Sequence, residues 1–124
     1  AHSGLNTPDA ETFAGRMAPG TACADAPVQV DGRDDWLLHA LGRGFTLLTF
    51  GDEAHAEPVS VGRVTARPLV VGRELVDRQG LVAQRYDGQP GTVYLIRPDQ
   101  HVAARWRRFD AAAVRAALQR ALAL

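Results

Sequence analysis

The residues that could carry chemistry in this sequence are few, and the first of them is a lone thiol. Cys23 is the only cysteine, which excludes an intramolecular disulfide and any metal site that needs two thiolates. It lies in a loop of small residues, 19–25, with no basic neighbour or helix start that would lower its pKa. We therefore expect an inert, partly buried thiol, and the alternative is a peroxidatic or sensor thiol.

Histidine occurs only at isolated positions, namely His2, His39, His55 and His101. No two of these have the His-x-x-x-His spacing that places two metal ligands on one helix face. The best metal-like cluster surrounds His55 and contains the carboxylates of Asp52, Glu53 and Glu57. A solvated loop explains the same residues, so we predict no metal site.

Other catalytic and cofactor patterns are missing as well. Ser3 and Ser60 are the only serines, and neither stands in a Gly-x-Ser-x-Gly sequence. The adjacent carboxylates of Asp34 and Asp35 suit a helix cap better than an acid–base pair. A Gly-x-Gly-x-x-Gly sequence within a βαβ unit, which binds dinucleotides, is absent. The sequence thus predicts neither catalytic nor cofactor-binding residues.

One basic stretch contains an aromatic residue: Arg105-Trp106-Arg107-Arg108. Grooves for single-stranded nucleic acid combine these residue types. The chain as a whole has 14 basic and 14 acidic residues, which removes the electrostatic case for nucleic acid or an anionic membrane. We interpret the stretch as a charged sheet edge that blocks strand addition, and the alternative is a docking surface for another domain or subunit.

Two apolar runs, 45–50 and 92–96, predict the strands that position these residues. A turn at Pro98-Asp99 follows the second run. The next strand should carry Val102, Ala104 and Trp106 on an apolar face, with Arg105 on the opposite, charged face. Residues 26–30 read as an edge strand that begins at Pro27, and Asp31-Gly32 as a tight turn. Segments 59–64 and 69–71 are either one interrupted strand or two.

Three helices are expected. The first covers 36–41, with Asp34-Asp35 as its cap and Trp36 on the same face as Leu37 and Leu41. The second covers 81–86. The third follows Asp110, and its apolar stripe consists of Val114, Ala117, Leu118, Ala121 and Leu122. Strands and helices in this order predict an α/β fold with a mixed central sheet flanked by helices.

The length of 124 residues and an apolar content of 46% predict one domain with a real core. Residues 1–14 are polar and resemble a linker or tail, which leaves 15–124 as the domain. There is no apolar run near the ~20 residues of a membrane span, and the N-terminus has no signal-peptide pattern. We therefore expect a cytoplasmic protein, and the missing initiator methionine suggests a processed chain or a fragment.

The order of elements, with a proline ahead of 92–96 and an amphipathic helix at the end, resembles the thioredoxin fold. This resemblance makes Pro90 the counterpart of the cis-proline of that fold, and the run from Asp77 to Pro90 is most similar to the peroxiredoxin branch. Thioredoxins carry Cys-x-x-Cys after the first central strand. Here residues 51–58 follow that strand and contain no cysteine, so the dithiol chemistry does not carry over.

A narrower resemblance covers most of residues 15–124. Its motifs are Gly15-Arg16-x-x-Pro19, the strand start Gly42-Arg43-Gly44-Phe45-Thr46-Leu47-Leu48, and the hairpin from Leu95 to Arg105. These are similar to the C-terminal domain of FAD-dependent aromatic hydroxylases, the phenol-hydroxylase-like flavin monooxygenases. That family has glycine where Gln100 stands, so Gln100 must adopt a left-handed φ or alter the turn.

The resemblance implies an accessory domain without catalytic residues of its own. In that family the domain has lost its redox cysteines, follows the FAD and substrate domains, and is associated with subunit contacts and structural support. The implied partners are the upstream domains of the same polypeptide and a second subunit in a homodimer. FAD and NAD(P)H are implied for the parent enzyme only. The alternative is a stand-alone one-cysteine thiol peroxidase or thioredoxin-like redox protein that uses Cys23.

Overall fold

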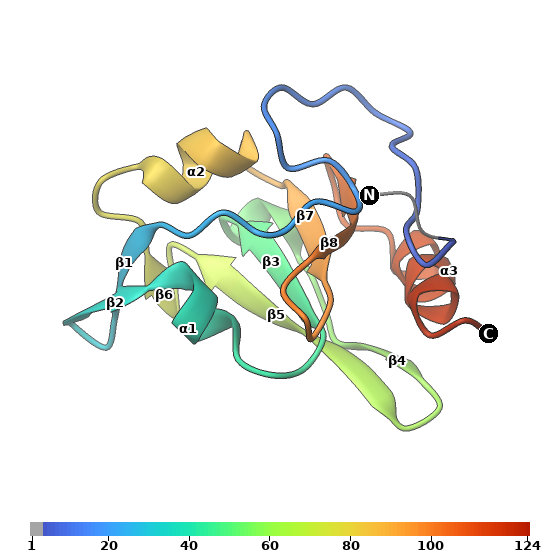
Figure 1. The fold of residues 1–124 in the computed structure, drawn as a ribbon. Helices are drawn as coiled ribbons and strands as arrows, with labels where there is room; N and C mark the ends of the chain where they lie inside the picture. The colour runs from blue at the N-terminus through green and yellow to red at the C-terminus, as the bar shows by residue number, and fades with distance from the viewer. Residues whose placement is uncertain (1–3) are drawn as a thin grey trace.

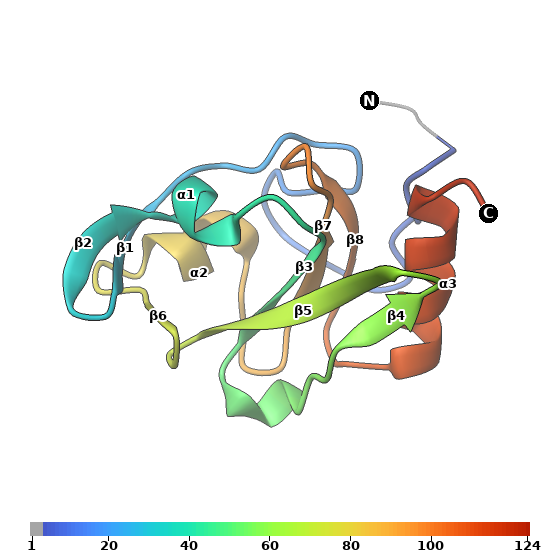
Figure 2. The same ribbon diagram turned by 90° about the horizontal axis from the view of Figure 1, so that it is seen from below.

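The computed structural model describes residues 4–124 as a mixed sheet with helices on both sides (Figures 1 and 2). The strands are β1 (Pro27–Val30), β2 (Arg33–Trp36), β3 (Thr46–Phe50), β4 (Val59–Val61), β5 (Val64–Val71), β6 (Leu75–Val76), β7 (Val93–Ile96) and β8 (Val102–Trp106). The helices are α1 (Leu37–Leu41), α2 (Leu81–Tyr86) and α3 (Ala111–Ala121), and the 3-10 turn η1 covers Asp52–Ala54. None of these helices is both long and apolar enough to cross a membrane.

The eight-stranded sheet has the order β2-β1-β6-β5-β3-β7-β8, with β4 paired to β5. At its centre β3 runs parallel to β5 and antiparallel to β7. Leu47 lies opposite Leu95 in this pairing, and every residue of β3 and β7 is buried. The predicted α/β fold with a mixed sheet and no Cys-x-x-Cys pair is therefore confirmed.

Each face of the central strands has its own core. Leu47, Val93 and Leu95 pack with the α3 stripe, of which Val114, Ala117 and Leu118 are fully buried. On the opposite face Leu48, Phe50, Tyr94 and Ile96 pack with buried residues of α1 and α2. Figure 2 shows α3 on one side of the sheet and the two shorter helices on the other. The predicted stripe of the third helix is confirmed.

An aspartate side chain accepts hydrogen bonds from the first free amides of all three helices. The acceptors are Asp25 for Leu38 of α1, Asp77 for Val82 and Ala83 of α2, and Asp110 for Ala112 and Ala113 of α3. A carboxylate at this place satisfies orphan N–H donors and complements the positive end of the helix dipole. The cap at Asp110 was expected from sequence, whereas those at Asp25 and Asp77 come from outside the predicted helices.

The prediction for the first helix was wrong at its start. Arg33–Trp36 form β2 as the second strand of a hairpin with β1, so Asp34 and Asp35 are strand residues rather than caps. Trp36 is 55% exposed and does not share the buried face of Leu37 and Leu41. The turn between these strands is as expected, because Asp31 and Gly32 both have positive φ values, 52° and 74°.

The edges of the sheet also differ from expectation. β1 pairs with both β2 and β6, so β2 is the edge strand. Residues 64–71 form one continuous strand, β5, in spite of Pro68. The Arg67 N–H bonds to the Phe45 carbonyl on the β3 side at 3.4 Å, so the Pro68 nitrogen faces the other edge. Along that edge β5 pairs with other strands only at residues 64–66 and at Val71. The backbone N–H that Pro68 lacks is therefore not needed for a hydrogen bond between strands.

A bulge changes the predicted faces of β8. Leu95 pairs with Ala104 while Ile96 pairs with Val102, which leaves Ala103 as an extra residue. Val102 therefore packs in the core of Tyr94 and Ile96, whereas Ala104 and Trp106 pack toward α3. The simple alternation expected from sequence was wrong at this point.

Single residues decide the backbone in the turn of the β7–β8 hairpin and in the segment just before β7. Gln100 adopts the left-handed φ of 62° that its place in the turn requires. The expectation of a cis bond at Pro90 was wrong, since no peptide bond among residues 4–124 is cis. Gly91 then donates to the Phe50 carbonyl at 2.8 Å and extends the pairing of β3 with β7.

Gly88 is expected to be intolerant of any side chain. A Cβ at this position would lie 2.3 Å from Cε2 of Phe50, a ring that is itself buried in the core. Gly88→Ala should therefore lower the free energy of unfolding by about 1–3 kcal/mol. Urea denaturation followed by circular dichroism measures this difference.

The matched control is Gly44→Ala, because a Cβ at Gly44 meets no atom within 4 Å. That variant should be as stable as the natural sequence or slightly more stable, since alanine restricts the unfolded chain. Equal stability of the two variants would contradict the packing of Gly88 on Phe50.

Candidate functional site

Cys23, the only thiol, is buried beneath the β7–β8 hairpin and is 8% exposed. Its backbone N–H donates to the Gln100 carbonyl at 2.9 Å, which ties the loop to the hairpin turn. Burial raises the pKa of the Cys23 thiol to about 11, and the charge of Asp99 adds to this, while a hydrogen bond with Tyr86 opposes it. A neutral, enclosed thiol is a poor nucleophile.

Two buried tyrosines lie behind Cys23 and were not singled out by sequence. The rings of Tyr86 and Tyr94 meet edge to face, with centroids 5.2 Å apart. The Tyr86 hydroxyl donates to the Ala24 carbonyl at 2.6 Å, and the Tyr94 hydroxyl donates to the Tyr86 carbonyl. Burial raises the pKa of both phenols. Both hydroxyls thus remain neutral. The Tyr86 hydroxyl joins α2 to the loop before β1, and the Tyr94 hydroxyl joins β7 to α2.

Arg105 is the charged member of this buried group. Only 5% of it is exposed, and its Nε and Nη2 atoms donate to the Asp9 carboxylate at 3.0 and 2.7 Å. Burial would lower the pKa of Arg105, but hydrogen bonds with Asp9 and Tyr94 outweigh it and raise the pKa. Arg105 is therefore a permanently charged, internally paired side chain.

The predicted charged edge at residues 105–108 was therefore wrong in its main feature. Arg105 and Trp106 are buried, Arg107 is half-buried, and Arg108 is exposed. Trp106 packs in the α3 core, so its ring is not available for base stacking. Sequence could not show this arrangement because Asp9, which pairs with Arg105, is 96 positions away.

The histidines do not come together into a metal site. The Nδ1 atom of His39 lies 2.9 Å from the Asp35 carboxylate, and that of His101 lies 3.6 Å from the Asp99 carboxylate. His55 is the residue that ends η1. His2 lies outside the described residues. Among residues 4–124, no group of three or more His, Cys, Asp or Glu side chains is placed to hold a metal ion.

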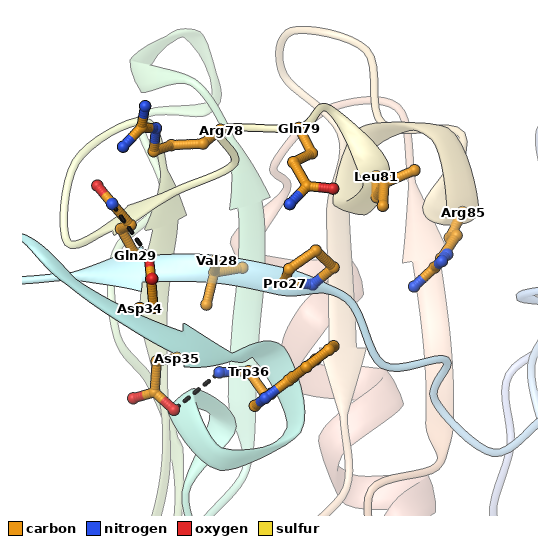
Figure 3. A pocket seen from close by; sticks show the side chains of 10 residues that line it. All are labelled: Pro27, Val28, Gln29, Asp34, Asp35, Trp36, Arg78, Gln79, Leu81 and Arg85. Carbon is orange, nitrogen blue, oxygen red and sulfur yellow. Dashed lines mark hydrogen bonds between the residues drawn. The ribbon is translucent and has the colours of Figure 1, made fainter.

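An open groove of about 720 Å³ lies between the β1–β2 hairpin and α2 (Figure 3). One wall carries Pro27 and Trp36, and the other carries Leu81 and Arg85 from α2. The remaining lining residues are Val28, Gln29, Asp34, Asp35, Arg78 and Gln79. Its apolar side chains and mixed charges suit contact with another protein surface.

The groove does not suit a dinucleotide cofactor. A pyrophosphate binds free N–H groups at a helix start, and the helix beside the groove is α2. Its first amides, Val82 and Ala83, already donate to the Asp77 carboxylate at 3.0 and 2.9 Å. A carboxylate at that place repels a phosphate, so the start of α2 does not offer a site for a pyrophosphate.

Cys23 should resist alkylation in the native state. Because its pKa rises from 9.0 to about 11, the thiolate is about a hundredfold scarcer at pH 8 than for an ordinary cysteine. Iodoacetamide should modify native Cys23 at least about a hundredfold more slowly than Cys23 in urea, with the native rate increasing toward pH 11. Equal rates in the folded and unfolded chain, measured by mass spectrometry, would contradict the burial of this thiol.

Comparison with known proteins gives a consistent picture. Residues 16–123 match the family "Aromatic-ring hydroxylase, C-terminal". No curated protein is significantly similar to the chain.

Solved structures of larger proteins, two of which contain FAD, share the fold over nearly the whole chain. Aklavinone-11 hydroxylase, solved as a ternary complex with FAD and aklavinone, is similar with a TM-score of 0.78 and 23% identity, covering 99% of this chain and 26% of that one. The flavin-dependent monooxygenase PieE gives a TM-score of 0.76 and 22% identity, covering 98% of this chain and 24% of that one. RebC gives a TM-score of 0.60 and 21% identity, covering 97% of this chain and 22% of that one.

This chain therefore spans about a quarter of the length of these solved proteins. The family match covers nearly all of the described residues, and the fold agrees with it. The chain belongs to the family of C-terminal domains of aromatic-ring hydroxylases.

Proposed function

We propose that this chain is the accessory, non-catalytic C-terminal domain of an FAD-dependent aromatic-ring hydroxylase. The observation that carries the proposal is the family match over residues 16–123, combined with structural similarity to about a quarter of two flavin monooxygenases. In this proposal FAD, NAD(P)H and the aromatic substrate bind to other parts of the parent polypeptide. A cytoplasmic location stays a prediction of the sequence.

The chemistry of the described residues supports a non-catalytic role. Aspartates occupy the N-termini of all three helices, where a nucleotide phosphate would otherwise find free amides. The burial and raised pKa of Cys23 argue against the alternative, a one-cysteine thiol peroxidase. Arg105, which is buried, and Arg107, which is half-buried, pair with Asp9 and Asp87 within the domain.

The surface supports a role in contacts with other domains or with a second subunit. Trp36 and Val76 are the largest exposed apolar side chains of the sheet, at 55% and 43% exposure. Both lie on the β2-β1-β6 part of the sheet, and Trp36 lines the groove. Exposed tryptophan is enriched at protein interfaces, so we assign the contacts to this end of the domain.

The flavin content of the purified chain tests the non-catalytic part of the proposal. We expect a colourless protein with no absorbance near about 450 nm, the flavin band. Titration of the chain into FAD should leave the flavin fluorescence unchanged. The reading frame upstream of Ala1 should encode FAD and substrate domains, and the longer polypeptide should retain flavin during purification.

A stoichiometric flavin in the chain alone would overturn the non-catalytic assignment. An upstream reading frame without flavin-binding domains would overturn the accessory assignment. The Cys23→Ser variant serves as the control for the thiol alternative: equal peroxide consumption by both chains supports the proposal, and a loss of peroxide consumption in the variant supports the alternative.

A further inference from the structure

The segment of residues 5–14, called here the N-terminal arm, arches from beside α3 past the β7–β8 end of the sheet (Figure 1). It is attached to the domain at several points between its beginning and its end. Its backbone meets the outer edge of β8, where the Thr7 N–H donates to the Ala103 carbonyl at 2.8 Å. Farther along, the Glu11 carboxylate accepts from the Arg107 N–H at 3.0 Å. The arm thereby satisfies backbone groups that β8 would otherwise leave unpaired.

Charge pairing fixes the middle of the arm. Asp9 accepts three hydrogen bonds from Nε and Nη2 of Arg105, between 2.7 and 3.2 Å. Arg105 is almost completely buried, so its charge requires this partner. A planar guanidinium that meets a carboxylate with two nitrogens also fixes orientation, not only distance.

An aromatic side chain fixes the end of the arm. The Phe13 ring lies between two guanidinium groups, with its centroid 4.4 Å from Arg105 Cζ and 3.8 Å from Arg107 Cζ. The same ring meets Tyr94 edge to face at 5.9 Å and packs on the core that α1 and α2 cover. Beside it the Ala14 N–H donates to the Asp87 carboxylate at 2.8 Å.

The beginning of the arm is held as well. Asn6 is 7% exposed and accepts from Arg97 Nη1 at 3.2 Å. Just before the arm, Gly4 offers its carbonyl to Arg120 Nε of α3 at 2.9 Å. The chain thus reaches the sheet beside α3, at the opposite end of the domain from β2 (Figure 2).

We propose that the N-terminal arm is a rigid part of this domain and not a flexible tether, and that the Asp9–Arg105 ion pair holds it in place. Building on the accessory role proposed above, the arm then delivers the upstream polypeptide at a fixed point beside α3. The orientation of this domain relative to the preceding one is set by side chains within residues 5–14, and a flexible connection can begin only before them.

Backbone NMR on the isolated chain tests this proposal directly. The backbone order parameters of residues 7–13 should equal those of β8, about 0.85. The amides of Thr7 and Ala14 should exchange at least about tenfold more slowly than in a peptide of residues 1–14, because both are hydrogen-bonded in the fold. Asp9→Asn should reduce the protection of Thr7 by about tenfold or more, since it removes a charge-assisted contact.

Asp52→Asn is the matched control, because it removes the same charge from an exposed ion pair with Arg73 that does not touch the arm. This substitution should leave the amide exchange rates of Thr7 and Ala14 unchanged. Order parameters below about 0.6 in residues 7–13 would overturn the rigid arm, and unchanged exchange in Asp9→Asn would overturn the role of the ion pair. Neither result bears on flavin binding, so failure of this proposal is distinct from failure of the accessory role.

Discussion

The pairing of β3 with β7 is the constraint from which the rest of the structure follows. All side chains of both strands are buried, so each face of the sheet centre must be covered. The α3 helix, with 11 residues, covers one face. The other face has only α1 and α2, of five and six residues, and Phe13 of the N-terminal arm extends the cover over Tyr94. The face without a long helix is therefore covered by several short elements together.

Several aspartates in the described part of the chain hold the fold together. Three aspartates bind helix N-termini, and Asp9 and Asp87 neutralise Arg105 and Arg107. Hydrogen bonds with Ala14 and Arg107 hold the pKa of Asp87 below its usual range. In the described part of the chain, these contacts occupy the first amides of three helices and the guanidinium groups of Arg105 and Arg107, and such groups can bind an anionic ligand when they are free.

Sequence patterns predicted those parts of the fold that depend on local residues. The strands at 45–50 and 92–96, the stripe of α3 and the Asp31-Gly32 turn follow from composition and spacing. The left-handed φ of Gln100 was one of the two alternatives that the family resemblance implied. The errors arose where strand pairing or a contact distant in sequence outweighed the local pattern. Asp34-Asp35 looked like a helix cap, but pairing of β2 with β1 outweighed that local preference. The alternation around Arg105 hid the bulge at Ala103 and the partner at Asp9. With only two residues, β6 is too short to show the alternation of a strand in the sequence. It forms because β1 and β5 both pair with it.

The two tryptophans occupy opposite environments, which gives the domain a pair of built-in optical probes. Trp106 is 9% exposed beneath α3, whereas Trp36 is 55% exposed beside the groove. Emission from an indole shifts to shorter wavelength when water leaves its surroundings, so the two residues respond to different events. Trp106 responds to opening of the α3 core, and Trp36 responds to any change in the exposure of the groove. Replacing either one with phenylalanine separates the two signals without adding a dye.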